Sequence, residues 1–358
     1  MTKLQAQRIP SSLPSSLGRT IALRRGRAQW TTIVLGALVL ALLPNFLSIF
    51  WIHLANVSLI AVIAAVALNI LTGNARLVSL GQAAFLGIGA FTAGILHRVF
   101  EVPFLVALTA AAVSGALVGY VIALLSLRLR VLYVAVTTLV LHFAVTTIFS
   151  FVQAVFLDSS GIIMPLPSLG FMTIRTPQQW YYFLVIIAAL TVVGALNLLR
   201  SYIGRRWIAV GEHDVAAEAL GVPVTKAKLS VFATTSAVVA FAGALYAYYI
   251  GTFSFESYNF SLAISYLAII IVGGVGSVLG SVLGAIFITL LPHVLDQMFL
   301  FLQLRLPANV LAGIHQIVFG VMIIGFLLFE PRGLAELWRR LSAVAADWPF
   351  RYRAFNRG

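Results

Sequence analysis

The sequence predicts an all-α, polytopic integral membrane protein with about ten spans. Of its 358 residues, 61% are hydrophobic and only 9% are charged, and the mean hydropathy is +1.04. Ordinary globular proteins carry about 25% charged residues, so this chain has too few polar side chains to cover a water-soluble fold. The apolar runs are long and continuous, which favours helices over the short alternating strands of a membrane barrel.

Ten apolar runs approach the length of about 20 residues that a helix needs to cross the hydrocarbon layer. We expect the spans near residues 30–50, 53–72, 78–97, 103–127, 131–156, 180–199, 229–250, 260–274, 277–298 and 309–329.

Lysine and arginine residues lie mostly on one side of this ten-span topology. If the N-terminus is cytoplasmic, 20 of the 23 basic residues fall in the inner segments 1–29, 73–77, 128–130, 200–228 and 330–358. Basic residues are retained on the cytoplasmic side of membrane proteins, so this asymmetry supports an even number of spans and cytoplasmic termini. The net charge of +13 is explained by topology, and no nucleic-acid partner is predicted.

The chain divides into a basic N-terminal arm (1–29), a membrane domain (30–329) and a C-terminal tail (330–358). The arm has no acidic residue and leads into a full-length span, so we expect an uncleaved cytoplasmic segment. Leu337, Trp338 and Leu341 recur at helical spacing in the tail. The tail therefore lies on the membrane surface or forms a plain positively charged end; the sequence permits both.

The composition excludes several kinds of chemistry. The chain has no cysteine, which removes disulfides, thiolate nucleophiles and cysteine-bound metal clusters. The six histidines are scattered and form no HExxH pair. We predict neither a metal site nor catalytic residues in this chain.

Two glycine-rich stretches interrupt the helical pattern. The first is Ser79–Gly94, which contains Gln82, Gly87 and Gly89, and the second is Gly273–Gly284. Small residues at every fourth position permit close helix packing. Broken helices are a compatible alternative, because their freed backbone groups can line a path for a polar solute. The pair Gly273 and Gly274 is the predicted break in the second stretch.

Few polar side chains lie within the spans. Thr138 and His142 are four residues apart and share a helix face. Hydroxyls in membrane helices commonly bond to their own backbone, whereas an ionisable residue in a span is a pathway candidate. For His142, a buried neutral histidine remains the alternative. No acid lies deep in a span, which argues against a carboxylate relay for protons or sodium.

The loop 200–228 is the one large cytoplasmic connection. Its residues predict a short helix that begins with Asp214 as a cap and ends before Gly221 and Pro223. A small-residue surface at Ala216 and Ala217 makes this helix a candidate docking element for a soluble partner. A helix that rests on the lipid headgroups is the alternative.

Several fragments, in order, resemble one family: the permeases of ABC importers of the branched-chain amino acid (LivM-type) family. The fragments span roughly 55–335 and are Leu77–Phe91, Gly204–Gly221 with Lys226 and Lys228, Ala242–Tyr249, Val272–Ala285 and Phe329–Leu334.

The resemblance implies a transport subunit of the bacterial inner membrane rather than an enzyme. Its implied partners are a second related permease, two cytoplasmic ATPases and a periplasmic solute-binding protein. ATP and magnesium would be bound by the ATPases, because this chain has no Walker A pattern. The family's loop helix enters a cleft on the ATPase, which assigns coupling to Arg205, Arg206, Glu212, Asp214, Ala216, Ala217, Glu218 and Gly221.

The chain also departs from the family. The external loop Leu157–Met164 is poor in glycine, Leu127 is followed by Arg-Leu-Arg, and the basic arm is long. These departures leave the identity of the transported solute open, and they affect the predicted fold less. Amino acids are the first expectation, with urea, short amides or aromatic acids as alternatives. A secondary carrier and an intramembrane enzyme are competing classes, and both would work without an ATPase.

Reporter fusions test the topology. Fusions at Gly18, Pro167, His213 and Phe255 should report cytoplasm, periplasm, cytoplasm and periplasm, because the positive-inside rule fixes the basic segments within. A periplasmic signal at His213 would refute the ten-span arrangement.

Overall fold

The computed structural model describes residues 40–127, 131–156, 161–168, 173–301, 307–330 and 332–346. Residues up to Leu47 form one unit, of which the short helix η1 (Leu43–Asn45) is described, and Ser48 onward forms a second unit. The predicted arm 1–29 and most of the first predicted span lie outside the described residues. The long helices of the described chain belong to the second unit.

The second unit is helical, and its bounds agree with the predicted spans to within a few residues. Its long helices are α3 (Ile49–Asn69), α4 (Gln82–Phe100), α5 (Phe104–Ser126), α6 (Val131–Phe156), α7 (Pro177–Arg200), α10 (Val224–Ile250), α11 (Phe260–Gly273), α12 (Val278–Phe301) and α13 (Ala308–Phe329). Its shorter elements are the π-helical turn η2 (Ile70–Asn74), α8 (Tyr202–Glu212), α9 (Asp214–Ala219), the 3-10 turn η3 (Phe255–Tyr258) and α14 (Gly333–Ala346).

Eight segments of the described chain are long and apolar enough to cross a membrane. They account for the second to ninth predicted spans, and α13 occupies the position of the tenth, although its described apolar stretch is shorter. The described residues also include an antiparallel pair of two-residue strands, β1 (Ile162–Ile163) and β2 (Thr252–Phe253), and one isolated bridge between Ser168 and Thr173. The all-α, multi-pass fold class is therefore confirmed.

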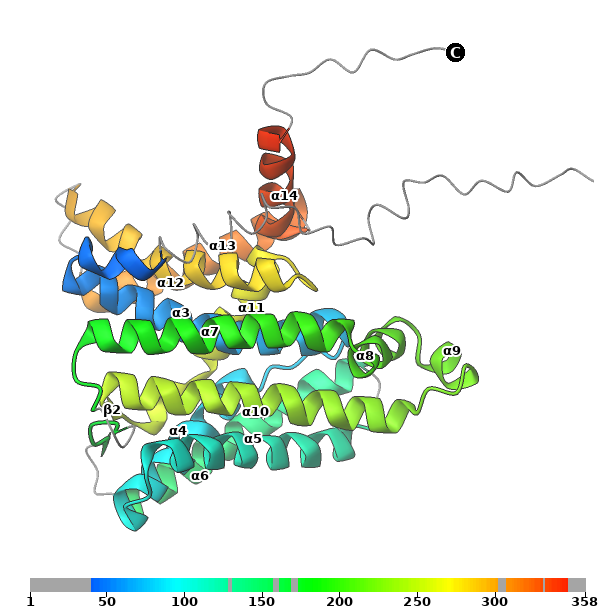
Figure 1. The fold of residues 1–358 in the computed structure, drawn as a ribbon, viewed down its shortest axis with the longest axis horizontal. Coiled ribbons are helices and arrows are strands. Elements are labelled where there is room, and N and C mark those ends of the chain that lie inside the picture. The colour runs from blue at the N-terminus through cyan, green and yellow to red at the C-terminus, as the bar shows by residue number, and fades with distance from the viewer. Residues whose placement is uncertain are drawn as a thin grey trace, which may run out of the picture. The chain divides into compact units, whose positions relative to one another are not determined.

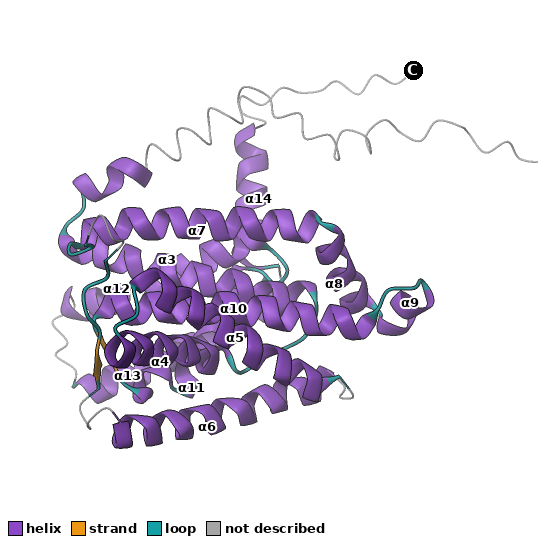
Figure 2. Ribbon diagram, turned by 60° about the horizontal axis from the view of Figure 1, so that its bottom comes forward, coloured by secondary structure: helices purple, strands orange, loops and turns teal. Residues whose placement is uncertain are grey.

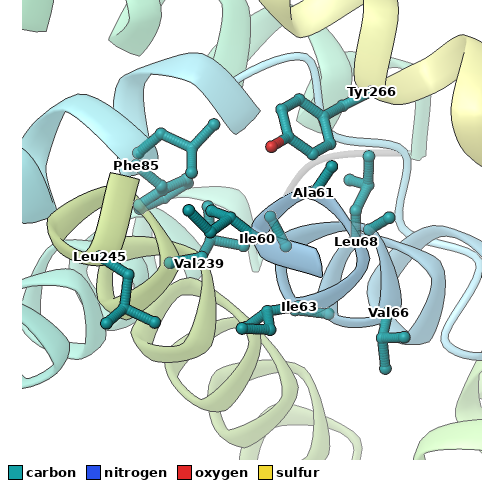
Figure 3. Close-up of a cluster of buried hydrophobic side chains, with 14 of the residues drawn as sticks. Ile60, Ala61, Ile63, Val66, Leu68, Phe85, Val239, Leu245 and Tyr266 are labelled. Atoms are coloured by element: carbon teal, nitrogen blue, oxygen red, sulfur yellow. The ribbon is translucent and has the colours of Figure 1, made fainter. Parts of the chain in front are cut away.

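Helix α3 is the centre of the unit. In its apolar stretch 83% of the residues are buried, against 17% in α7. A helix that is apolar on every face is stable only when it is surrounded, and α3 contacts α7, α10, α11 and α12. Figure 3 shows this core, with side chains of α3 meeting those of neighbouring helices at Ile60, Ile63, Val66, Phe85, Val239, Leu245 and Tyr266.

Glycine sets the spacing between α10 and its neighbours α4 and α5, which run beside it (Figure 1). A Cβ at Gly89 would lie 1.7 Å from the Ala240 carbonyl oxygen, and one at Gly243 would lie 2.0 Å from that of Leu86. On α5, a Cβ at Gly115 would lie 2.3 Å from the Cβ of Ala240. The backbones therefore touch, as in the small-residue contacts of membrane helices.

Side-chain caps fix where two of the helices begin. Thr176 accepts a hydrogen bond from the Gln179 N–H, and the Gln179 side chain accepts one from the Thr176 N–H, which completes a capping box at the start of α7. Asn259 accepts the Leu262 N–H at 3.1 Å and starts α11. Both caps satisfy amide groups that a helix start leaves unpaired.

The α4–α10 contact can be tested by adding one methyl group. Gly243→Ala should destabilise the protein by about 1–3 kcal/mol, because the new Cβ has no space beside the Leu86 carbonyl. The measurement is thermal unfolding in detergent. Gly194→Ala on α7 is the matched control, because a Cβ there meets nothing within 4 Å and alanine favours helix. Equal stability of the two variants would contradict the packing argument.

Candidate functional site

The predicted break in the second glycine-rich stretch is present between α11 and α12. Helix α11 ends at Gly273 and α12 begins at Val278. Gly274 has φ +123° and Gly276 has φ +81°, conformations that L side chains rarely adopt. The chain therefore reverses direction within four residues, and backbone groups of these residues lose their helical partners.

A single amide, Asn69 of α3, holds this break. Its Nδ2 donates hydrogen bonds to the Ser277 carbonyl at 2.8 Å and to the Ser281 hydroxyl at 2.6 Å. Its Oδ1 accepts the Gly276 N–H at 2.7 Å. The amide thus replaces partners that the interrupted helix lost. Sequence analysis missed Asn69, although a lone amide at the end of an apolar span was a usable signal.

Direct contact between backbones allows the Asn69 amide to reach the residues of the break. A Cβ at Gly73 would lie 2.2 Å from the Gly276 nitrogen, and one at Gly284 would lie 2.1 Å from the Ile269 carbonyl oxygen. A Cβ at Gly273 would lie 2.1 Å from the Gly280 carbonyl oxygen. The small-residue stripe is thus used within this chain, and the packing and broken-helix interpretations both hold.

The connection between α13 and α14 covers the other side of the break. A Cβ at Gly274 would lie 2.6 Å from the Arg332 carbonyl oxygen, and one at Gly333 would lie 2.6 Å from the Gly274 nitrogen. Helix α14 then runs across the direction of the long helices (Figure 1). Gly273 and Gly274 therefore lie in a packed junction, and their role in a solute path stays a prediction.

The predicted pathway residues of the first glycine-rich stretch are buried at helix contacts. Gln82 donates a hydrogen bond to the Ala64 carbonyl of α3 at 3.0 Å. A Cβ at Gly87 would lie 2.8 Å from the Phe149 ring, and Gly89 packs on α10. These residues position α4. A transport role for them stays a prediction.

Thr138 and His142 share a buried face of α6, as their spacing predicted. The Thr138 hydroxyl donates to the Ala135 carbonyl and accepts the Leu80 N–H, each at 2.9 Å, so it fixes the residues before α4. Nδ1 of His142 has no hydrogen-bond partner within the described chain, and the ring lies 6.0 Å from that of Phe260. His142 therefore remains a pathway candidate.

Helix α8 seats the large loop on the bundle. The buried Trp207 donates from Nε1 to the Ser230 hydroxyl at 2.8 Å. Gly211 lies against the turn after α3, where a Cβ would come within 2.7 Å of the Asn74 carbonyl oxygen. The Arg76 guanidinium pairs with the Glu212 carboxylate at 2.6 Å. The predicted coupling residue Glu212 thus joins the loop to the end of the α3 segment.

The predicted loop helix exists as α9, which lies beside α8 (Figure 2). The expected cap was wrong in one detail: His213 occupies the cap position without a side-chain hydrogen bond, and Asp214 is the first helical residue. The Asp214 carboxylate accepts from Lys228 Nζ at 2.6 Å. This hydrogen bond holds the pKa of Asp214 below its ordinary value, so the carboxyl group is ionised at neutral pH.

The outer surface of α9 differs from the predicted one. Ala216 and Glu218 are exposed as expected, but Ala217 is only 3% exposed and faces the protein. The exposed apolar side chains are Val215, at 71%, and Leu220, at 85%. Sequence analysis did not assign either of them to the docking surface, because helical periodicity could not say which face the bundle covers.

The end of α9 requires glycine, as predicted. Gly221 has φ +81°. Its N–H bonds to the Glu218 carbonyl at 2.9 Å, and the Val222 N–H bonds to the Ala217 carbonyl at 2.9 Å. This pair of hydrogen bonds is the Schellman motif.

The two predicted coupling arginines contact α7 and α8. Arg205 is exposed and donates to the Arg200 carbonyl at 2.7 Å. Arg206 stacks 3.8 Å above the Tyr202 ring and bonds to its hydroxyl. Both cations are positioned within the loop, and their role toward a partner stays a prediction.

These features define a class: a multi-pass, all-helical membrane protein in which a broken helix packs on one central helix, while a loop helix outside the candidate spans packs on α8 and α10. The family described as "Branched-chain amino acid transport system / permease component" matches residues 50–327. The chain therefore belongs to this family of ABC-type permeases, and the resemblance in its motifs is confirmed.

Individual relatives agree with the family. The chain is 28% identical to the high-affinity branched-chain amino acid transport system permease protein LivM of Salmonella typhimurium, over 80% of this chain and 70% of the relative. It is 28% identical to LivM of Escherichia coli, over 83% and 72%. The autoinducer 2 import system permease protein LsrC of an Enterobacter species is 29% identical over 47% of each chain. No solved structure matches.

The Asn69 junction can be tested by cysteine labelling, since the chain has no native cysteine. In a Ser277→Cys background, Asn69→Ala should raise the maleimide labelling rate about tenfold, because unpaired backbone groups cost about 1–3 kcal/mol and about 1.4 kcal/mol is tenfold. Asn56→Ala is the control: Asn56 is also buried in α3 but bonds to the Pro177 carbonyl. Equal labelling in both variants would contradict the role of Asn69.

Proposed function

We propose that the chain is the permease subunit of an ATP-driven importer, and that it passes a small polar solute from a periplasmic binding protein to the cytosol. Branched-chain or other amino acids are the first candidates. The observation that carries the proposal is α9, a short helix outside the candidate spans that exposes two large apolar side chains.

Those two side chains need a partner. Fully burying a valine or leucine side chain contributes about 1.5–3 kcal/mol, and Val215 and Leu220 are mostly exposed. Apolar groups gathered on a loop helix are typical of a protein interface. Ala216 allows close approach, and Glu218 can pair at the rim. The partner that fits is an ATPase subunit, which would bind the ATP and magnesium.

A continuous set of contacts leads from α9 to the helix break. Ala217 is buried and packs α9 against the bundle. Helix α8 directly precedes α9, and Gly211 in its last turn touches the turn after α3. That turn directly follows Asn69, whose amide holds Gly276 and Ser277. A movement of α9 imposed by nucleotide binding would thus reach the break through the contact of α8 with the turn after α3 and then through the Asn69 amide.

The proposed orientation rests on the basic residues. Both termini and the loop 200–228 would lie in the cytosol, and the protein would reside in the bacterial inner membrane. A second, related permease would pair with this one, and two ATPases and a binding protein would complete the importer. Among the relatives, LivM belongs to a branched-chain amino acid system and LsrC to an autoinducer 2 system, so uptake must decide the solute.

Charge on the outer face of α9 tests the coupling. Leu220→Glu, and separately Val215→Glu, should lower solute-stimulated ATP hydrolysis and uptake at least tenfold in vesicles that hold the whole complex. The reason is that each lost apolar contact is worth about 1.5–3 kcal/mol. Gly221→Val should act likewise because it strains the end of the helix. Membrane insertion should not change.

Lys226→Glu is the control, because it alters an exposed residue near α9 without touching its outer face. Arg205→Ala should be mild, since exposed ion pairs contribute under about 1 kcal/mol. Full activity of both the Leu220 and Gly221 variants would reject α9 as the docking element.

A further inference from the structure

A cavity of about 240 Å³ lies between α3, α4, α10, α11, α12 and α13, and none of the predicted site residues line it. Pockets for drug-sized ligands start at roughly 300 Å³, so this one suits a smaller group. Its α11 wall includes Ile269, four residues before the end of that helix at the break. The cavity and the junction that Asn69 holds therefore share helices α3, α11 and α12.

The wall is mainly apolar and contains no charged side chain. Ile60 and Ala61 of α3 and Leu86 of α4 form one part, and Phe319 of α13 forms another. Figure 3 shows Tyr266 of α11 directed toward Ala61. An ionised group would lose its hydration here without gaining a counter-ion, so the cavity selects an uncharged group.

Hydroxyl groups are the polar part of the wall. Tyr246, Tyr258 and Tyr266 all line the cavity, together with Ser265 and Thr289. The Tyr258 hydroxyl is fully buried and has no hydrogen-bond partner in the described chain. A buried polar atom without a partner is costly, and it indicates a place where a bound molecule supplies the missing hydrogen bond.

Helix α12 contributes a backbone acceptor that lacks its usual helical donor. Pro292 lies within this helix and has no N–H, so the Ile288 carbonyl loses its helical donor. Ile288 and Pro292 both line the cavity. A carbonyl without its usual helical donor and a phenolic hydroxyl without a partner in the described chain thus belong to residues that line one cavity.

We propose that this cavity binds the uncharged, mainly apolar side chain of the transported solute, an inference that rests on the proposed import function. An amino acid with an aliphatic side chain meets these conditions. Its ammonium and carboxylate groups remain outside the apolar wall, which has no charge to pair with them. A charged side chain, as in glutamate, is excluded.

The test uses vesicles that hold the whole complex and measures the uptake of labelled L-leucine, L-alanine and L-glutamate. Ser265→Leu, which fills the cavity, should lower leucine uptake relative to alanine uptake about tenfold. Thr191→Leu is the matched control. Thr191 also bonds to its own helix and lines a cavity, but that cavity is bounded by α3, α7, α8 and α10 and is not the one that Tyr258 lines. The control should keep the wild-type ratio.

A second variant separates binding from stability. Tyr258→Phe removes a hydroxyl that has no partner in the described chain, so a purely structural role predicts a higher Tm with unchanged uptake. A solute-binding role predicts a higher Tm together with a several-fold higher KM for leucine. Tyr249→Phe, whose hydroxyl bonds to His53 at 2.8 Å, is the control with no expected change in KM.

The outcomes separate the two proposals. If the wild-type complex takes up leucine, but Ser265→Leu keeps the leucine-to-alanine ratio and Tyr258→Phe keeps the KM, the cavity is not the solute site. Preferred uptake of glutamate would also overturn the inference. If the wild-type complex shows neither uptake nor solute-stimulated ATP hydrolysis, the import function itself fails, and this inference fails with it.

Discussion

Asn69 lies at the end of α3, the most buried of the candidate spans in the described chain, and its amide bonds to backbone and side-chain groups on both sides of a helix break. A membrane interior offers no water to the polar groups that such a break exposes. One side chain with both a donor and an acceptor meets this need from the side of α3. The position of α12 relative to α3 depends on it.

Close backbone contact at glycine residues is the second requirement for the helix break that Asn69 holds. The Asn69 amide reaches Gly276 and Ser277 because Gly73 lets two backbones touch, and any Cβ there would collide with the Gly276 nitrogen. The same principle recurs where Gly89 and Gly243 bring α4 against α10. Packing in lipid gains little from the hydrophobic effect and relies on close contact, so glycine positions here decide which helices are neighbours.

The unit combines a rigid centre with surfaces that need partners. Helices α5, α6 and α7 expose large apolar side chains such as Leu117, Phe143 and Ile186, which lipid or a second permease can cover. Val215 of α9 and Leu220, the residue that follows this helix, are exposed outside the candidate spans. This difference in position separates the apolar surface of the spans from the proposed docking element, although the residue types are alike.

The sequence by itself determined the class of the protein, the position of nearly every described helix, the break at Gly273 and Gly274, and the end of α9 at Gly221. These features result from local composition: long apolar runs, paired glycines, and a glycine that can adopt positive φ. Only the tertiary structure decided that Ala217 faces inward while Leu220 faces outward, that Asp214 pairs with Lys228, and that Asn69 joins α3 to residues about two hundred positions later. Such contacts depend on which helix faces which. When helices are apolar on nearly every face, the hydrophobic periodicity of the sequence does not indicate which face meets which neighbour.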